Sequence, residues 1–260
     1  MPFGLTNAVP TFQRLMSAVL EGLLPLKCLV YLDDVLVVGQ SFEQHLENLK
    51  AVLQAISKAG LKLKVSKCHF GQSSVDFLRF TISASGLAPD PKKVEAISRY
   101  PAPKDLTELR RFLGMTSYYS RFISGFSDIA SPLNHLTQKD VPFLWDKNCE
   151  HAFETLKEQL ISTSVLGFPN QERDYILYND ASDVGVGAVL DQKNGSEEEK
   201  VISYASKAFS GSVKNWTTTE KEAYAVVWAI HVYGRKVGKA EEYKTSEWQA
   251  GTLDFEAGRV

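Results

Sequence analysis

The stretch Lys27-Cys-Leu-Val-Tyr-Leu-Asp-Asp-Val-Leu-Val-Val-Gly39 decides how the first part of this chain folds. Two apolar runs flank the acidic pair Asp33 and Asp34, which predicts a strand, a tight turn and a second strand. Two adjacent carboxylates in so apolar a hairpin repel each other and lose hydration. We therefore expect these carboxylates either to hold a cation between them or to emerge at a cleft.

A helix is predicted directly after this hairpin. Ser41 and Gln44 have the spacing of a capping box, apolar residues then recur at helical spacing, and Gly60 ends the pattern. Further strands are expected over residues 61–65 and 75–82. The helix is therefore predicted to pack on a sheet.

Four prolines between residues 89 and 103 predict a boundary between subdomains. A short helix is expected over residues 92–99, and an acidic cap at Asp105 opens a longer one. Arginines alternate with aromatic side chains along residues 110–122. This composition is typical of base stacking and phosphate contact, and equally of a packing face with solvated arginines.

The second half of the chain changes from helix to strands. A helix is expected after Pro142, and a last helix is predicted to be capped by Thr219 with Glu222 three residues on. Between them, strands are expected over residues 175–179, 184–190 and 201–204. Periodicity disappears from Gly234 onward. The pattern as a whole predicts an α+β protein.

The composition is that of a soluble globular protein. The 260 residues have a mass of 28.9 kDa, 44% hydrophobic and 23% charged side chains, and a mean hydropathy of −0.17. No long uncharged apolar run is present, which argues against a membrane partner. Three widely spaced cysteines fit a reducing compartment rather than a disulfide framework. No secretory signal is visible, so a cytoplasmic or nuclear location is expected.

Charge is divided unevenly between the two parts of the chain. The formal net charge of −2 is the sum of +5 over residues 1–139 and −7 over residues 140–260. Lys50, Lys58, Lys62, Lys64 and Lys67 follow one another without an intervening acidic residue. Such a run can face phosphates, although a solvated helix face and loop is the commoner reason for it.

Read together, these segments resemble the polymerase polyprotein of gypsy-type LTR retrotransposons. Tyr31-Leu-Asp-Asp34 is similar to the Tyr-x-Asp-Asp signature of reverse transcriptases, and the segment from Met1 to Gln13 to the one that shapes their nucleotide pocket. Arg111-Phe-Leu-Gly-Met-Thr-Ser-Tyr-Tyr-Ser-Arg-Phe-Ile123 resembles the thumb and connection region. The start of an RNase H-like domain resembles Leu177-Tyr-Asn-Asp-Ala-Ser182, Gly185-Val-Gly-Ala-Val-Leu190 and Thr217-Thr-Thr-Glu-Lys-Glu222.

The resemblance implies an order of domains. Residues 1–88 correspond to part of a reverse transcriptase palm, an antiparallel sheet with helices, and residues 89–140 to a helical thumb and connection. Residues 141–235 correspond to part of an RNase H-like α/β domain, and residues 236–260 to a divergent, disordered tail.

The resemblance also implies two sites for phosphoryl transfer, each with two Mg²⁺ or Mn²⁺ ions. The catalytic and metal-binding residues it indicates are Asp33, Asp34, Asp180 and Glu222, with Glu220 as a competitor of Glu222. The implied nucleotide pocket consists of Pro2, Phe3, Gly4 and Tyr31. Contacts to template-primer and RNA/DNA hybrid are expected from Lys62, Lys64, Lys67, Arg110, Arg111 and Arg121. The intact enzyme would also bind a dNTP.

Two pieces of the family pattern are not found in these residues. The family takes one further aspartate from a strand before the segment at Met1, and another from a strand after the last helix. We therefore expect the polypeptide alone to be inactive, and a catalytically inactive remnant that at most binds nucleic acid is the alternative. A metal module built from Cys68, His69, Cys149 and His151 matches no zinc spacing.

Overall fold

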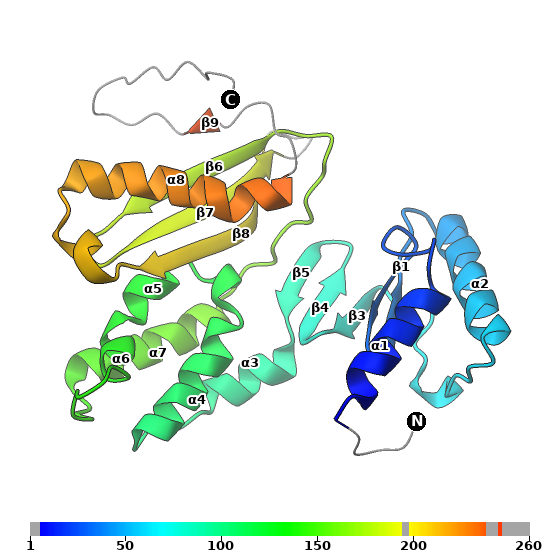
Figure 1. Cartoon of the computed structure of the whole chain (residues 1–260), viewed down its shortest axis with the longest axis horizontal. Helices are drawn as coiled ribbons and strands as arrows, with labels where there is room; N and C mark the ends of the chain where they lie inside the picture. Colours follow the sequence, from blue (N-terminus) through cyan, green and yellow to red (C-terminus); the bar gives the residue numbers. More distant parts are fainter. Residues whose placement is uncertain (1–5, 194–197, 238–243, 246–260) are drawn as a thin grey trace. The chain divides into compact units, whose positions relative to one another are not determined.

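The computed structural model describes residues 6–193, 198–237 and 244–245, and the chain divides into two compact units at Leu78 and Arg79 (Figure 1). Each unit has its own hydrophobic core. No helix within the described ranges combines the length and the apolar composition needed to cross a bilayer.

The first unit packs two helices on a short hairpin. Its elements are α1 (Ala8–Val19), β1 (Cys28–Tyr31), β2 (Asp34–Val37), α2 (Phe42–Lys58), a 3₁₀ turn η1 (Val65–Lys67) and β3 (Ser74–Phe77). Strands β1 and β2 pair antiparallel from Cys28 opposite Val37 to Tyr31 opposite Asp34. The buried side chains of this unit are Met16, Leu20, Cys28, Val52 and Ile56. The predicted strand, tight turn and strand are confirmed.

The predicted capping box opens α2. The Ser41 hydroxyl accepts a hydrogen bond from the Gln44 backbone N–H at 3.2 Å, and the Gln44 side chain accepts one from the Gln40 N–H at 2.6 Å. The strand expected over residues 61–65 is wrong: these residues form no strand and lead into η1. Lys62 and Lys64 in this stretch are exposed, and the alternating apolar and polar residues pair with no strand of the described sheets.

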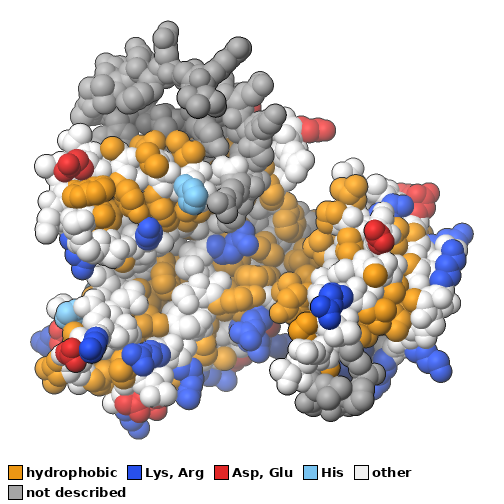
Figure 2. All heavy atoms as spheres, in the orientation of Figure 1, with side chains coloured by type: hydrophobic (Ala, Val, Ile, Leu, Met, Phe, Trp, Pro, Cys, Tyr) orange, Lys and Arg blue, Asp and Glu red, His pale blue; other side chains and the backbone are white. Residues whose placement is uncertain are grey.

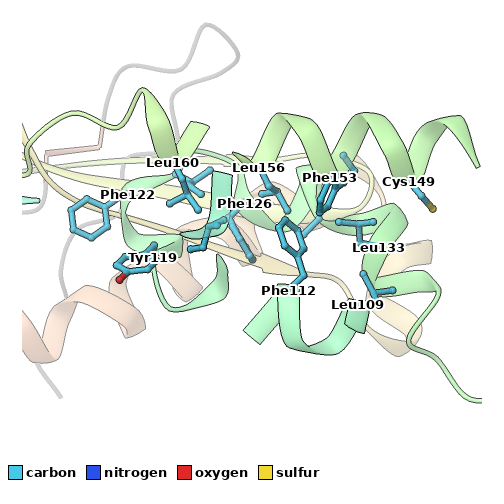
Figure 3. Close-up of a cluster of buried hydrophobic side chains, with 14 of the residues drawn as sticks. Leu109, Phe112, Tyr119, Phe122, Phe126, Leu133, Cys149, Phe153, Leu156 and Leu160 are labelled. Carbon is cyan, nitrogen blue, oxygen red and sulfur yellow. The ribbon is translucent and has the colours of Figure 1, made fainter. Parts of the chain in front are cut away.

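The second unit begins with the hairpin of β4 (Phe80–Ser83) and β5 (Gly86–Pro89). Helices follow as α3 (Pro91–Ser98), α4 (Leu106–Ser117), η2 (Ser120–Phe122), α5 (Phe126–Ile129), α6 (Ser131–His135) and α7 (Lys147–Ile161). Asp90, Asp105 and Asp146 each accept a hydrogen bond from a backbone N–H in the first turn of the helix that follows. Apolar faces of α4 and α7 meet at Phe112 and Phe153, whose ring centroids lie 4.5 Å apart (Figure 3).

A four-stranded sheet completes the second unit. It contains β6 (Tyr175–Ala181), β7 (Gly185–Lys193), β8 (Glu199–Ala208) and β9 (Lys244–Thr245) in the order β8-β7-β6-β9, with η3 (Gly211–Asn215) and α8 (Thr218–Val237) between β8 and β9. Helix α8 covers one face of this sheet (Figure 1). Helix α5 contacts β8, where the Ser127 N–H donates to the Ser206 hydroxyl at 2.9 Å. The boundaries expected at residues 88 and 140 therefore lie inside one compact unit.

Two expectations are changed by these elements. The single strand predicted over residues 75–82 is two strands, because the chain reverses at Leu78 and Arg79, both with positive φ. Helix α8 extends beyond Gly234 to Val237, and β9 pairs in parallel with β6, so residues 236–237 and 244–245 of the expected disordered tail are in regular elements. The rest of that tail lies outside the described residues.

Candidate functional site

Asp33 and Asp34 lie at the turn of the β1–β2 hairpin, and both are exposed. The turn begins at Leu32, whose φ of +56° is uncommon for a residue with a branched side chain. The Leu32 N–H donates to the side-chain oxygen of Gln13 on α1 at 2.5 Å. A rigid element thus presents two adjacent carboxylates to solvent. Both carboxylates are solvated at this turn, and a cation or a cleft beside them stays a prediction.

The expected nucleotide pocket is only partly described. Tyr31, next to this turn, is 51% exposed and lies opposite Asp34 in the hairpin. Pro2, Phe3 and Gly4 lie outside the described residues. The structure therefore brings together Tyr31, Asp33 and Asp34 and leaves the rest of the pocket as a prediction.

Asp180 and Glu222 form the second acidic pair. Asp180 lies near the end of β6, and Glu222 lies in the first turns of α8, which packs on that strand. Burial, and then the negative charge of Asp180, raises the pKa of the Glu222 carboxyl, while the Ala181 backbone lowers it. The Glu222 Oε2 atom is buried, and no described residue donates a hydrogen bond to it. Two carboxylates that are 42 positions apart in the sequence are therefore close enough to interact.

The structure also separates Glu222 from Glu220. Thr217, not Thr219, caps α8: the Glu220 carboxylate accepts hydrogen bonds from the Thr217 N–H at 2.8 Å and hydroxyl at 2.9 Å. The Glu220 N–H donates back to the Thr217 hydroxyl at 3.3 Å, which completes a capping box. The predicted cap at Thr219 and Glu222 is wrong by two residues. Glu220 is exposed and serves the helix end, which leaves Glu222 to face Asp180.

Both acidic pairs suit a hard divalent cation, which prefers carboxylate oxygens on rigid elements. The buried Glu222 oxygen without a donor is the specific observation, because such an atom costs free energy unless something compensates its charge. Within the described ranges, no group of three or more His, Cys, Asp or Glu side chains could hold a metal ion. Each site therefore supplies two carboxylates from the described part of the chain.

The predicted nucleic-acid contacts do not share one environment. Lys62 and Lys64 lie between α2 and η1, Lys67 lies in η1, and all three are exposed. Arg110 and Arg111 are exposed on α4. Burial lowers the pKa of Arg121 in η2, and its Nε atom is buried without a hydrogen-bond partner among the described residues. The first five residues can reach a phosphate from the surface, whereas Arg121 lines a cavity of about 120 Å³ inside the second unit.

An exposed stack beside α4 was not predicted. The Arg79 guanidinium lies 5.5 Å from the centre of the Tyr118 ring, which stacks on Phe80 with centroids 5.3 Å apart. Alternation of arginine with aromatic residues over 110–122 was the available signal, but it did not indicate that Arg79 joins them.

Sequence reasoning also missed two buried charged residues of the second unit. Asp191 on β7 is 7% exposed, and its Oδ1 atom has no hydrogen-bond partner in the described part of the chain. Lys221 is equally buried and forms an ion pair of 3.2 Å with the exposed Asp183 in the loop between β6 and β7. The only sequence signal for Asp191 was a charge inside an apolar strand, and the only one for Lys221 was a charge at the start of a helix.

Comparison with known proteins identifies both parts of the chain. Residues 1–82 match the family model of reverse transcriptase (RNA-dependent DNA polymerase). Residues 145–240 match the RNase H-like domain found in reverse transcriptase. The chain belongs to the reverse transcriptases. Its two matched segments follow each other in the predicted order, so the resemblance inferred from the motifs is confirmed.

Curated relatives of this reverse transcriptase are transposon polyproteins. It is 38% identical to the retrovirus-related Pol polyprotein from transposon opus of Drosophila melanogaster, covering 99% of this chain and 27% of that protein. It is 38% identical to the Pol polyprotein from transposon 412 of the same species, covering 90% and 19%. The Tf2-3 polyprotein of Schizosaccharomyces pombe is 34% identical, covering 87% and 17%. The chain thus spans about a quarter or less of the length of these relatives.

Solved structures confirm the fold. A foamy viral protease-reverse transcriptase in complex with double-stranded DNA has a TM-score of 0.78 at 23% identity, covering 91% of this chain and 49% of that one. The same type of protein in complex with an RNA/DNA hybrid has a TM-score of 0.74 at 24% identity, covering 90% and 31%. The predicted α+β arrangement of palm, helices and RNase H-like domain is therefore confirmed as a fold.

Proposed function

We propose that this reverse transcriptase segment belongs to a gypsy-type LTR retrotransposon polyprotein that copies RNA into DNA and degrades the RNA strand of the hybrid. The observation that carries the proposal is that Asp180 and Glu222 approach each other, while the buried Oε2 atom of Glu222 receives no hydrogen bond from any described residue. Transposon polyproteins at 34–38% identity support the element class. A cytoplasmic or nuclear location is proposed with it.

At the RNase H-like site, Asp180 and Glu222 would hold the metal. Bound divalent cations would direct water onto an RNA phosphodiester and stabilise the leaving oxygen. The fixed positions of β6 and α8 keep the two carboxylates close before any ion binds, so little free energy is lost in assembling them. Because the pKa of Glu222 is raised, this side chain takes up a proton at a higher pH than an ordinary glutamate, and protonation would weaken metal binding.

At the polymerase site, Asp33 is proposed to provide most of the metal coordination, with Asp34 supporting it. Both carboxylates lie on a hairpin turn that Gln13 fixes through the Leu32 N–H. Tyr31 is the described member of the proposed nucleotide pocket. A dNTP, a template-primer and Mg²⁺ or Mn²⁺ are the ligands proposed for this site.

Metal binding at the second site is the first test. Mn²⁺ titrated into the 260-residue chain, followed by the broadening of NMR signals, should affect residues of β6 and the start of α8. Asp180→Asn and Glu222→Gln should abolish the effect there. Glu220→Gln is the matched control, since Glu220 lies two residues away and caps the helix. Equal loss of Mn²⁺ binding in the control would contradict the assignment of Glu222.

Catalysis by the 260 residues alone is the second test. We expect neither primer extension nor cleavage of an RNA/DNA hybrid, because the described residues bring only two carboxylates to each site. A nucleic-acid-binding remnant without activity is the second candidate function, and the same observation favours it. Template-dependent extension that Asp33→Asn abolishes would show instead that two carboxylates suffice.

A further inference from the structure

Helix α2 has a second apolar face besides the one that packs on the core of the first unit. Asn48, Val52 and Ile56 are its buried residues. Phe42, Leu46, Leu49 and Leu53 are not part of that core, and Phe42 and Leu46 are 65% and 47% exposed. Hydrophobic side chains at the surface of the part that carries α1 and α2 are visible in Figure 2.

The four side chains form a single line along the helix. Their spacing of four, three and four residues repeats the seam of a coiled coil, and at 100° per residue all four fall within about one sixth of the helix circumference. A shallow groove of about 380 Å³ runs beside them. It is lined by Leu46, Leu49, Lys50, Leu53, Gln54 and Ser57. The seam thus has the width and the shape that a second helix would fill.

This seam is complementary to itself when a second helix runs antiparallel. Phe42 of one copy then lies opposite Leu53 of the other, and Leu46 lies opposite Leu49. On the solvent side of the seam, Glu43 comes opposite Lys50 of the other copy. A parallel pair would instead place Lys50 against His45 of the other helix and would give Glu43 no oppositely charged partner on α2. We propose that α2 is the interface of an antiparallel dimer of this chain.

The charges on the seam support this occupant. The backbone N–H of Glu43 and then the Ser41 hydroxyl lower the pKa of the Glu43 carboxyl, so it is ionised at neutral pH. Glu43 and Lys50 are exposed, and neither forms an ion pair within the described part of the chain. Glu43 of one copy can therefore pair with Lys50 of the other copy across the two-fold axis of the dimer. One helix pair makes a small interface, so we expect a weak dimer with a dissociation constant on the order of 10 µM.

Sedimentation equilibrium of the 260-residue chain without nucleic acid tests the proposal. The wild-type chain should pass from monomer to dimer with rising concentration. Leu46→Glu should raise the dissociation constant at least about tenfold, because it buries a carboxylate at the centre of the seam. Lys58→Gln is the matched control, since it changes the charge of the same helix by the same one unit at an exposed residue that does not line the groove. Wild-type chain that stays monomeric at every concentration would overturn the proposal, and would leave the face to another segment or partner.

Charge reversal tests the antiparallel direction. Lys50→Glu and Glu43→Lys should each weaken the dimer, and the double variant should restore it, because both opposed pairs are then opposite in sign again. Failure of the double variant to restore dimerisation would overturn the antiparallel arrangement. Glu43 lies in the first turn of α2, where a lysine is unfavourable, so circular dichroism of each variant distinguishes loss of the helix from loss of the interface.

Discussion

At the scale of single residues, Asp191 is a carboxyl group buried in the sheet of the second unit. Burial, and then the charge of Glu199, raises its pKa to about 6. Tyr178, Tyr204 and Tyr233 are the other titratable groups that interact with it. Because the folded pKa lies above the unfolded value of 3.8, the stability that Asp191 contributes is full below pH 4 and is lost as the pH rises through 6.

Asp191→Asn should therefore stabilise the protein at neutral pH only. We expect the free energy of unfolding to rise by about 1–3 kcal/mol at pH 8, because the variant no longer buries a charge, and to change little at pH 4. Urea denaturation at both pH values measures this. Asp174→Asn, at an exposed aspartate before β6, is the control. Equal stabilisation of the Asp191 variant at both pH values would contradict the assigned charge.

Arg79 carries backbone strain as well as an aromatic contact. Its φ is +65°, a region that costs a side-chain-bearing residue about 1 kcal/mol, and its guanidinium lies over Tyr118. Arg79→Gly and Arg79→Ala both remove the guanidinium, but only glycine relieves the strain. The glycine variant should be more stable than the alanine variant by about 1 kcal/mol in thermal or urea unfolding. Identical stabilities would show that the turn relaxes around either residue.

At the scale of elements, Gln13 joins α1 to the hairpin that carries Asp33 and Asp34. Its side-chain oxygen is the acceptor for the Leu32 N–H, and its amide nitrogen donates to the Ser17 hydroxyl at 3.3 Å. Gln13→Leu should destabilise the first unit by about 1–2 kcal/mol, because a partly buried N–H loses its acceptor. Hydrogen exchange of the Leu32 amide should become faster. Ser17→Ala, which removes only the second contact, should leave that exchange rate unchanged.

Elements whose determinants are local were predictable from the sequence. The Asp33–Asp34 hairpin, the cap at Ser41 and the cap of α4 at Asp105 depend on residues within a few positions of each other. The strand expected over residues 61–65 was wrong because a strand needs a partner that sequence periodicity does not supply. The site followed the same rule: motifs indicated Asp180 and Glu222, whereas the packing of α8 decided between Glu222 and Glu220.

The cap of α8 shows that the two neighbouring glutamates cannot be told apart from the sequence. Thr217 and Thr219 are each followed by a glutamate three residues later, so sequence alone gives two equivalent capping boxes. Burial of Lys221 and Ala225 against the sheet fixes the rotation of the helix, and only the box of Thr217 and Glu220 is then exposed. A tertiary contact, not local chemistry, therefore decides which glutamate caps the helix and which one interacts with Asp180.

At the scale of the whole molecule, the division of charge is the feature that the sequence predicts without any structure. The basic residues 1–139 include the exposed Lys62, Lys64 and Lys67, and the acidic residues 140–260 include both carboxylates of the second site. Counterion release makes binding to a polyanion depend on the number of phosphates contacted rather than on the net charge of the protein. A chain with a net charge of −2 can therefore bind nucleic acid through its basic part.

Replacing these three lysines by glutamine tests that inference. Binding of an RNA/DNA hybrid is measured by fluorescence anisotropy at a series of salt concentrations. The slope of the logarithm of the association constant against the logarithm of the salt concentration should become shallower by about 2–3 units, because each lysine neutralises one phosphate. The matched control replaces Lys147, Lys193 and Lys214, which are equally exposed but lie in the acidic part. The control should keep the wild-type slope. If both triple variants lose the same slope, the hybrid responds to total charge, and the basic residues after α2 are not its binding surface.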